Sequence, residues 1–213
     1  MITESKVTEI FCIADDFCKD FEVEMAKSSL PSSSEAPKRR RKRMMSDAEV
    51  ITILICFHFN TYRNFKHYYL SCVCGQWRHL FPRRFSYNRF VEVMPRCFVA
   101  LTMFLRLACF GKCTDISFVD STCIPVIHNK REFNMKVFKD IAAKGRSTMG
   151  WYVGFKLHLL CNEKGELVNF VLTRANVDDR EESVIDTLTD KVFGKLYADK
   201  GYISQSLFGH LWD

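Results

Sequence analysis

Two aspartates, Asp120 and Asp199, each follow a short run of residues that is typical of a β-strand. If the two strands are neighbours, both carboxylates lie at one edge of a sheet. Hard oxygen ligands of this kind bind Mg²⁺ or Mn²⁺, and two such ions about 4 Å apart can activate an attacking oxygen and stabilise a leaving oxygen on phosphorus. The spacing alone is weak support, because Asp is also a common capping residue at helix starts.

The elements that must position these aspartates have the pattern of an α/β (α+β) domain over residues 111–213. Strands are expected at 116–119, 151–161, 166–173 and 195–198, and a helix is expected at 178–192. The polar turn Asn162-Glu163-Lys164-Gly165 joins the second and third strands as a hairpin. The order β-β-β-α-β predicts a mixed sheet with flanking helices that begins with antiparallel neighbours.

The first 110 residues have a helical pattern instead. Residues 4–26 predict an amphipathic helix, and the Ser- and Pro-rich stretch up to residue 37 predicts a flexible linker. Ser46-Asp47-Ala48-Glu49 has the form of a capping box, so a helix should begin at Ser46. A short helix is expected at 62–72, and a third from Ser86 to about Phe110. The third helix should turn these side chains inward: Phe90, Val91, Met94, Phe98, Leu101, Leu105 and Leu107.

Positive charge is concentrated in residues 38–110, where Lys and Arg outnumber Asp and Glu by 14 to 3. The change in charge predicts three segments, at 1–37, 38–110 and 111–213. A block this basic favours a polyanion, and nucleic acid ahead of a membrane surface because no lipid-anchoring signal accompanies it. We predict an all-helical, helix-turn-helix-like DNA-binding domain at 38–110. Its contacts with double-stranded DNA would come from Lys38, Arg39, Arg40, Arg41, Lys42, Arg43, Arg63 and Lys66. A solubilising tail and a helical domain with a merely basic face are the alternatives.

Cysteine usage and hydropathy bear on the compartment. Most of the ten cysteines lie among apolar neighbours, which indicates reduced, buried thiols in a cytoplasmic protein. The longest uncharged apolar run, 50–59, is about half of the roughly 20 residues that a membrane span needs. Zinc at Cys72, Cys74 and His79 is disfavoured, since the usual two-residue spacing between the cysteines and a fourth ligand are missing.

Four motifs around the aspartates occur in a characteristic order. They are Phe118-Val119-Asp120-Ser121-Thr122, Gly154-Phe155-Lys156-Leu157-His158, Asn176-Val177-Asp178-Asp179-Arg180 and Asp199-Lys200-Gly201-Tyr202-Ile203-Ser204. In this order they closely resemble the catalytic core of the insertion-sequence DDE transposases. Residues 46–54, 62–66, 86–90 and 147–151 are similar to the insertion-sequence 982 family in particular, so that the resemblance covers roughly residues 44–208.

This resemblance implies a ribonuclease-H-like fold in which Asp120 and Asp199 are catalytic and bind metal, with two Mg²⁺ or Mn²⁺ ions in the complete site. In that family, metal-activated water cleaves DNA at the element's end, and the freed 3′-hydroxyl attacks target DNA. The implied partners are terminal inverted repeats and target DNA, and action on two ends favours a homodimer. The expected location is the cytoplasm, in association with the nucleoid.

The family's third acid, a Glu on a later helix, has no counterpart here, because no Glu follows Gly201. We therefore expect a sheet domain that is incomplete at the C-terminus and a chain that is inactive by itself. The rival hypotheses are a non-catalytic DNA-binding remnant or regulator of the intact transposase, and a metal-dependent nuclease without strand transfer.

Other polar residues near the aspartates have less specific expectations. Lys156 and Lys200 are predicted to contact DNA, whereas His158 is expected to have a structural role. The acids Asp178, Asp179, Glu181 and Glu182 are expected to stabilise a helix N-terminus rather than to bind metal. Between the first two strands lie four cations that could contact phosphate: Lys130, Arg131, Lys136 and Lys139. The aromatics Tyr68, Tyr69, Tyr87 and Trp151 are expected in the core rather than as base-stacking platforms.

Overall fold

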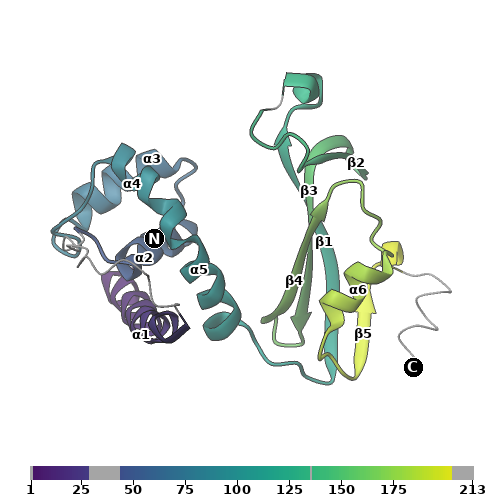
Figure 1. Ribbon diagram of the computed structural model, residues 1–213, viewed down its shortest axis with the longest axis horizontal. Helices are drawn as coiled ribbons and strands as arrows, with labels where there is room; N and C mark the ends of the chain where they lie inside the picture. Colours follow the sequence, from purple (N-terminus) through teal and green to yellow (C-terminus); the bar gives the residue numbers. More distant parts are fainter. Residues whose placement is uncertain (1, 29–43, 135, 203–213) are drawn as a thin grey trace. The chain divides into compact units, whose positions relative to one another are not determined.

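The computed structural model describes residues 2–28, 44–134 and 136–202, which form two compact units that divide between Ala108 and Cys109 (Figure 1). Each unit has its own hydrophobic core. The basic run Lys38–Arg43 lies outside the described residues.

The described part of the first unit consists of helices and the loops that join them. It contains the α-helices α1 (Glu4–Ser28), α2 (Asp47–Phe59), α3 (Phe65–Tyr68), α4 (Tyr87–Val93) and α5 (Phe98–Phe104), the π-helices η1 (Tyr69–Gln76) and η3 (Leu105–Cys109), and the 3₁₀ turn η2 (Met94–Cys97). The predicted start of α2 is confirmed. Glu49 N donates to Ser46 Oγ at 3.1 Å, and Ser46 N donates to Glu49 Oε2 at 2.7 Å, which completes the capping box.

The single helix expected from Ser86 to Phe110 is wrong, because the stretch is interrupted at η2. Pro95 has no N–H to donate to the helix, and a 3₁₀ turn replaces the α-helical one. Three residues per turn shift the phase of the buried face. Phe98 and Leu107, which follow the turn, are therefore exposed by 69% and 68%, and Val91, which precedes it, is exposed by 42%. The buried positions are Phe90, Val93, Cys97, Ala100 and Phe104.

The core of the helical unit is rich in aromatic side chains, and its two fully buried tyrosines have hydrogen-bond partners. Tyr68 and Tyr69 are fully buried, as predicted. Tyr68 Oη donates to the Ile53 carbonyl at 3.0 Å, and Tyr69 Oη donates to the Phe85 carbonyl at 2.8 Å. Both hydroxyls are thus satisfied inside the core. In the described parts of the chain, each helix is too short or too polar to cross a bilayer.

The second unit is a mixed five-stranded sheet with helical cover. Its strands are β1 (Ile116–Ile127), β2 (Ala143–Ser147), β3 (Gly150–Asn162), β4 (Leu167–Arg174) and β5 (Lys195–Ala198), accompanied by η4 (Asn129–Asn134), α6 (Glu182–Thr189) and η5 (Lys200–Tyr202). The order is β2-β3-β1-β5, and β4 also pairs with β3. β1 is parallel to β5, and the other pairs are antiparallel. The predicted mixed sheet is confirmed.

Three details of this unit differ from expectation. β1 does not end before Asp120, because its pairing with the long strand β3 continues as far as Ile127. β2 was not expected. The last helix covers only Glu182–Thr189, since residues 175–180 form a loop whose polar groups have partners of their own. The hairpin turn is confirmed, with Gly165 N donating to the Asn162 carbonyl at 2.9 Å.

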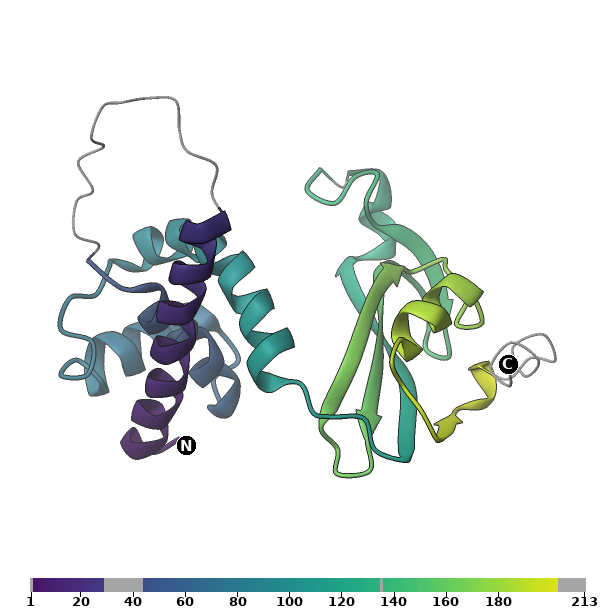
Figure 2. The same ribbon diagram turned by 60° about the horizontal axis from the view of Figure 1, so that its bottom comes forward.

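One face of the sheet lies under α6 (Figure 2). Val119 and Leu160 from the sheet pack there with Ile185 and Leu188 of the helix and with Tyr202. Trp151, at the start of β3, is not part of this core. Its side chain is 58% exposed, so the expectation of a buried Trp151 is wrong. In the burial pattern of β3, Trp151 is an exposed position next to the buried Tyr152.

Candidate functional site

Asp120 and Asp199 occupy equivalent positions on two neighbouring parallel strands. In the register of β1 and β5, Val119 lies opposite Ala198; Asp120 is the next residue of β1, and Asp199 directly follows the end of β5. Neighbouring strands are about 4.8 Å apart. The two aspartate-bearing strands are therefore neighbours, which is the condition for both carboxylates to lie at one edge of the sheet.

Both aspartates are exposed to solvent. The rings of Phe118 and Tyr197, two residues before each aspartate, stack with 5.5 Å between centroids, so these positions share a face of the sheet. Alternation puts Asp120 on this face, opposite the one that Val119 turns toward α6. Asp120 is exposed, and its Oδ1 accepts a 2.7 Å hydrogen bond from Ser121 N. Asp199 is exposed as well.

The pair has the donor chemistry of a magnesium site. Mg²⁺ is commonly bound by one or two carboxylates, with waters and substrate phosphates as its remaining ligands. Two adjacent exposed carboxylates fit this requirement. The described residues contain no group of three or more His, Cys, Asp or Glu side chains that could hold a metal ion. His79 of the disfavoured zinc set instead lies 3.2 Å from the carboxylate of Glu4.

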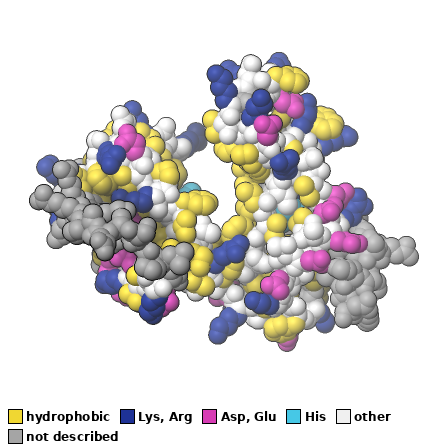
Figure 3. All heavy atoms as spheres, in the orientation of Figure 1, with side chains coloured by type: hydrophobic (Ala, Val, Ile, Leu, Met, Phe, Trp, Pro, Cys, Tyr) yellow, Lys and Arg dark blue, Asp and Glu magenta, His cyan; other side chains and the backbone are white. Residues whose placement is uncertain are grey.

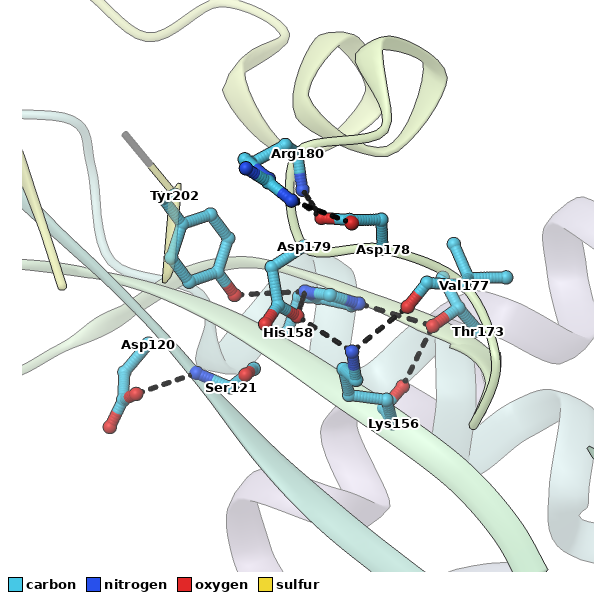
Figure 4. A network of polar contacts seen from close by, with 10 residues as sticks. All are labelled: Asp120, Ser121, Lys156, His158, Thr173, Val177, Asp178, Asp179, Arg180 and Tyr202. Atoms are coloured by element: carbon cyan, nitrogen blue, oxygen red, sulfur yellow. Dashed lines mark hydrogen bonds and ion pairs between the residues drawn. The ribbon is translucent and has the colours of Figure 1, made fainter. Parts of the chain in front are cut away.

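A polar network centred on the buried His158 lies beside the segment that carries Asp120 and Ser121 (Figure 4). His158 of β3 is fully buried, with Nδ1 2.9 Å from Tyr202 Oη and Nε2 3.1 Å from Thr173 Oγ1. The Thr173 hydroxyl donates to the Lys156 carbonyl at 3.5 Å, so its oxygen accepts from Nε2–H. Nδ1 is then the acceptor for Tyr202 O–H. This assigns the Nε2–H tautomer of a neutral imidazole.

The protonation states agree with that assignment. Burial lowers the pKa of His158, and the opposing effect of the Asp179 carboxylate is smaller. Burial also raises the pKa of Tyr202 to about 12, while a hydrogen bond from Ser121 acts in the opposite direction. Ser121 follows Asp120, and Tyr202 lies three residues after Asp199. The neutral network therefore connects the segments that carry both aspartates.

Asp178 and Asp179 have partners other than the helix N-terminus, which corrects their expected role. Lys156 Nζ lies 3.0 Å from Asp179 Oδ1 and donates to the Val177 carbonyl at 2.9 Å. Asp178 accepts two 3.0 Å hydrogen bonds from the Arg180 side chain, which holds its pKa at about 2. α6 begins only at Glu182, beyond both contacts. These aspartates stabilise the loop that precedes the helix.

The predicted DNA-binding residues differ in their surroundings. Lys156 is 9% exposed, and its ammonium is engaged with the 175–180 loop. Arg63 and Lys66 are exposed in the helical unit, where Lys66 Nζ lies 5.7 Å from the centroid of the Tyr87 ring. Lys200 belongs to η5, and its side chain lies outside the described residues. Contacts of these residues with DNA stay predictions.

Sequence reasoning missed the partnership of Asp179 with Lys156 and that of His158 with Tyr202. All four residues are in the family-like motifs, which was the available signal. Nothing in their spacing indicates which side chains meet, because they come from three separate elements.

Comparison with known protein families is consistent with this arrangement. Residues 110–213 match the family model described as "Transposase DDE domain". The matched region is the sheet unit with Asp120 and Asp199, and the match supports a DDE transposase, a class of enzyme that generally uses divalent metal ions. No curated protein and no solved structure matches the chain.

Proposed function

We propose that this chain belongs to an insertion-sequence transposase of the 982 type and combines a DNA-binding helical unit with a DDE catalytic core. Asp120 and Asp199 bind the metal ions of this core. The observation that carries the proposal is the parallel pairing of β1 with β5, which makes the two aspartates neighbours within the region that matches a transposase domain.

The chemistry follows from the ligands. A bound Mg²⁺ would lower the pKa of attacking water and neutralise charge that develops on the scissile phosphate. The exposed position of Asp120 and Asp199 leaves room for a DNA phosphate beside the metal. Behind them, the His158–Tyr202 hydrogen bond holds η5 against β3, so the segment after Asp199 is held near β1.

The proposed substrate is double-stranded DNA, first at terminal inverted repeats and then at a target. The basic helical unit would bind the repeats through phosphate contacts of Arg63, Lys66 and the Lys38–Arg43 run. A homodimer would bring two ends together. Joined products distinguish this function from that of a simple metal-dependent nuclease, which would release only nicked DNA.

A second candidate is a DNA-binding regulator of the intact enzyme. It is favoured by the exposed cations of the helical unit, among them Arg63 and Lys66, which could bind DNA without the metal site.

The test is metal binding, which does not depend on catalysis. Mn²⁺ affinity of the full chain is measured by electron paramagnetic resonance for wild type, Asp120→Asn and Asp199→Asn. Each substitution replaces a charged ligand by a neutral one and should weaken Mn²⁺ binding by about tenfold or more. Glu163→Gln, in the exposed hairpin turn, is the matched control and should bind as wild type does. An unchanged affinity in either aspartate variant would refute the assignment of that residue.

A further inference from the structure

A polar pocket of about 570 Å³ lies in the sheet unit beside the segment that follows Asp199. It is formed by the edge of β2, the first part of β3, the 175–180 loop and η5. The residues that matter here are Lys144, Arg146, Trp151, Lys156, Arg180 and Gly201. Its size is that of a small-molecule site, but such sites are mostly apolar. The charged lining therefore favours a polar ligand.

The charge balance of the lining favours an anion. Four cationic side chains face two acidic ones, Asp178 and Asp179. Asp178 forms an ion pair with Arg180, and Asp179 forms one with Lys156; the distance is 3.0 Å in both pairs. Lys144 pairs with Glu132 at 2.8 Å, outside the lining, and Arg146 has no acidic partner within the described part of the chain. The guanidinium of Arg146 is thus available for a bound anion.

Arg146 lies beside an exposed aromatic ring. It is opposite Trp151 in the β2–β3 register, and its Cζ is 6.0 Å from the centroid of the Trp151 ring. An indole that is 58% exposed offers a flat surface for stacking. A guanidinium next to that surface suits a phosphate, which it can bind through two parallel hydrogen bonds. A base with its phosphate matches both features together.

The backbone fixes the shape of this pocket. A Cβ atom added to Gly145 would lie 2.0 Å from the Ala175 carbonyl oxygen, so β2 rests directly on the residue that starts the 175–180 loop. Gly201, two residues after Asp199, contributes to the wall. Lys and Arg side chains also gather over the end of the unit that carries β2 and η4 (Figure 3). The close contact of β2 with the 175–180 loop therefore fixes one wall of the pocket.

We propose that this pocket binds one nucleotide of a single DNA strand that passes the aspartate pair. Arg146 contacts its phosphate, and the Trp151 ring stacks on its base. A base inside a duplex stacks on its neighbours, so the site selects a strand that is unpaired at this position. The proposal rests on the proposed function, which brings DNA to the same unit, and adds a site distinct from the metal ligands.

The test compares two labelled single strands, one normal and one with abasic positions, by fluorescence anisotropy with the full chain in the absence of metal. The ratio of the two affinities isolates the stacking contribution, because the phosphates and the basic run act on both strands. Wild type should prefer the normal strand by about fivefold or more. In Trp151→Ala this ratio should fall to about one, and Trp151→Phe should restore most of it. Arg146→Ala should lower the affinity for both strands. The control Lys164→Ala, in the hairpin turn, should change neither affinity.

Three outcomes would overturn the proposal. One is an equal ratio for wild type and Trp151→Ala when circular dichroism shows both to be folded. Another is an Arg146→Ala variant that binds both strands as wild type does. The third is a free mononucleotide that competes as well as the strand, which would make this a small-nucleotide site. None of these outcomes alters Mn²⁺ binding by Asp120 and Asp199, so failure of the pocket and failure of the proposed function are distinguishable.

Discussion

Tyr202 donates a hydrogen bond of 2.9 Å to Nδ1 of the fully buried His158, and this bond joins the turn after β5 to the centre of β3. Each partner of this bond lies close to one of the two aspartates. Tyr202 follows Asp199 by three residues, and His158 lies opposite Ser121, the residue after Asp120. The relative position of the two candidate metal ligands therefore depends on a pair of side chains that bind no metal themselves.

Removal of the Tyr202 hydroxyl should destabilise the sheet unit. Tyr202→Phe leaves a buried imidazole nitrogen without a donor, which costs about 1–3 kcal/mol in free energy of unfolding. Urea denaturation followed by circular dichroism measures this loss. Tyr197→Phe is the control, because Tyr197 is 50% exposed and should cost much less. Equal effects of the two substitutions would show that the hydrogen bond contributes nothing specific.

The stability of the chain should fall as the pH drops below about 6.5. Burial lowers the pKa of His158 from 6.5, so the unfolded chain takes up a proton at this residue before the folded one does. The contribution is complete above pH 6.5 and is lost as the pH falls toward the folded pKa, with a slope of at most about 1.4 kcal/mol per pH unit. Urea denaturation between pH 5 and pH 8 (roughly the range in which His titrates) measures the slope.

His158→Gln provides the comparison for this pH dependence. The variant should be less stable than wild type at neutral pH but should have a flatter profile at acidic pH, because the titrating group has gone. A profile as steep as that of wild type would mean that another group causes the acid sensitivity.

The contact between Lys156 and Asp179 should appear as an energetic coupling. Loss of either charge leaves the other in a partly buried position, which is costly. We expect Lys156→Met and Asp179→Asn to destabilise individually, and the double variant to lose less than the sum, with a coupling of about 0.5–3 kcal/mol. A double-mutant cycle in urea gives this value. Additive effects would favour the original prediction that Lys156 serves DNA rather than the 175–180 loop.

Gly145→Ala should disturb the pocket more than its size suggests. The new methyl group would meet the Ala175 carbonyl oxygen at 2.0 Å, so β2 or the loop must shift, and overpacking of this kind costs about 1–3 kcal/mol. Thermal denaturation measures the cost. Gly75→Ala is a suitable control, because its methyl group would lie 3.7 Å from the nearest atom, an ordinary contact. A Gly145→Ala variant as stable as this control would contradict the described packing of β2.

Local features of the sequence were sufficient for several elements. The capping box at Ser46, the turn at Asn162–Gly165 and the bounds of β5 were all predicted, because caps, turns and strand alternation depend on residues a few positions apart. The order of the family-like motifs also indicated the class of enzyme that the match over residues 110–213 supports. These inferences needed no knowledge of long-range contacts.

The tertiary structure alone decided which distant residues meet. The neighbouring positions of Asp120 and Asp199 depend on β1 pairing with β5, which is separated from it by three strands and a helix in the chain. Tyr202 reaching His158, Lys156 reaching Asp179, and Trp151 remaining exposed beside Arg146 depend likewise on how strands and loops pack. Sequence spacing determines the face and the period of an element, whereas the partner of a buried polar group is chosen by the packing that must satisfy it.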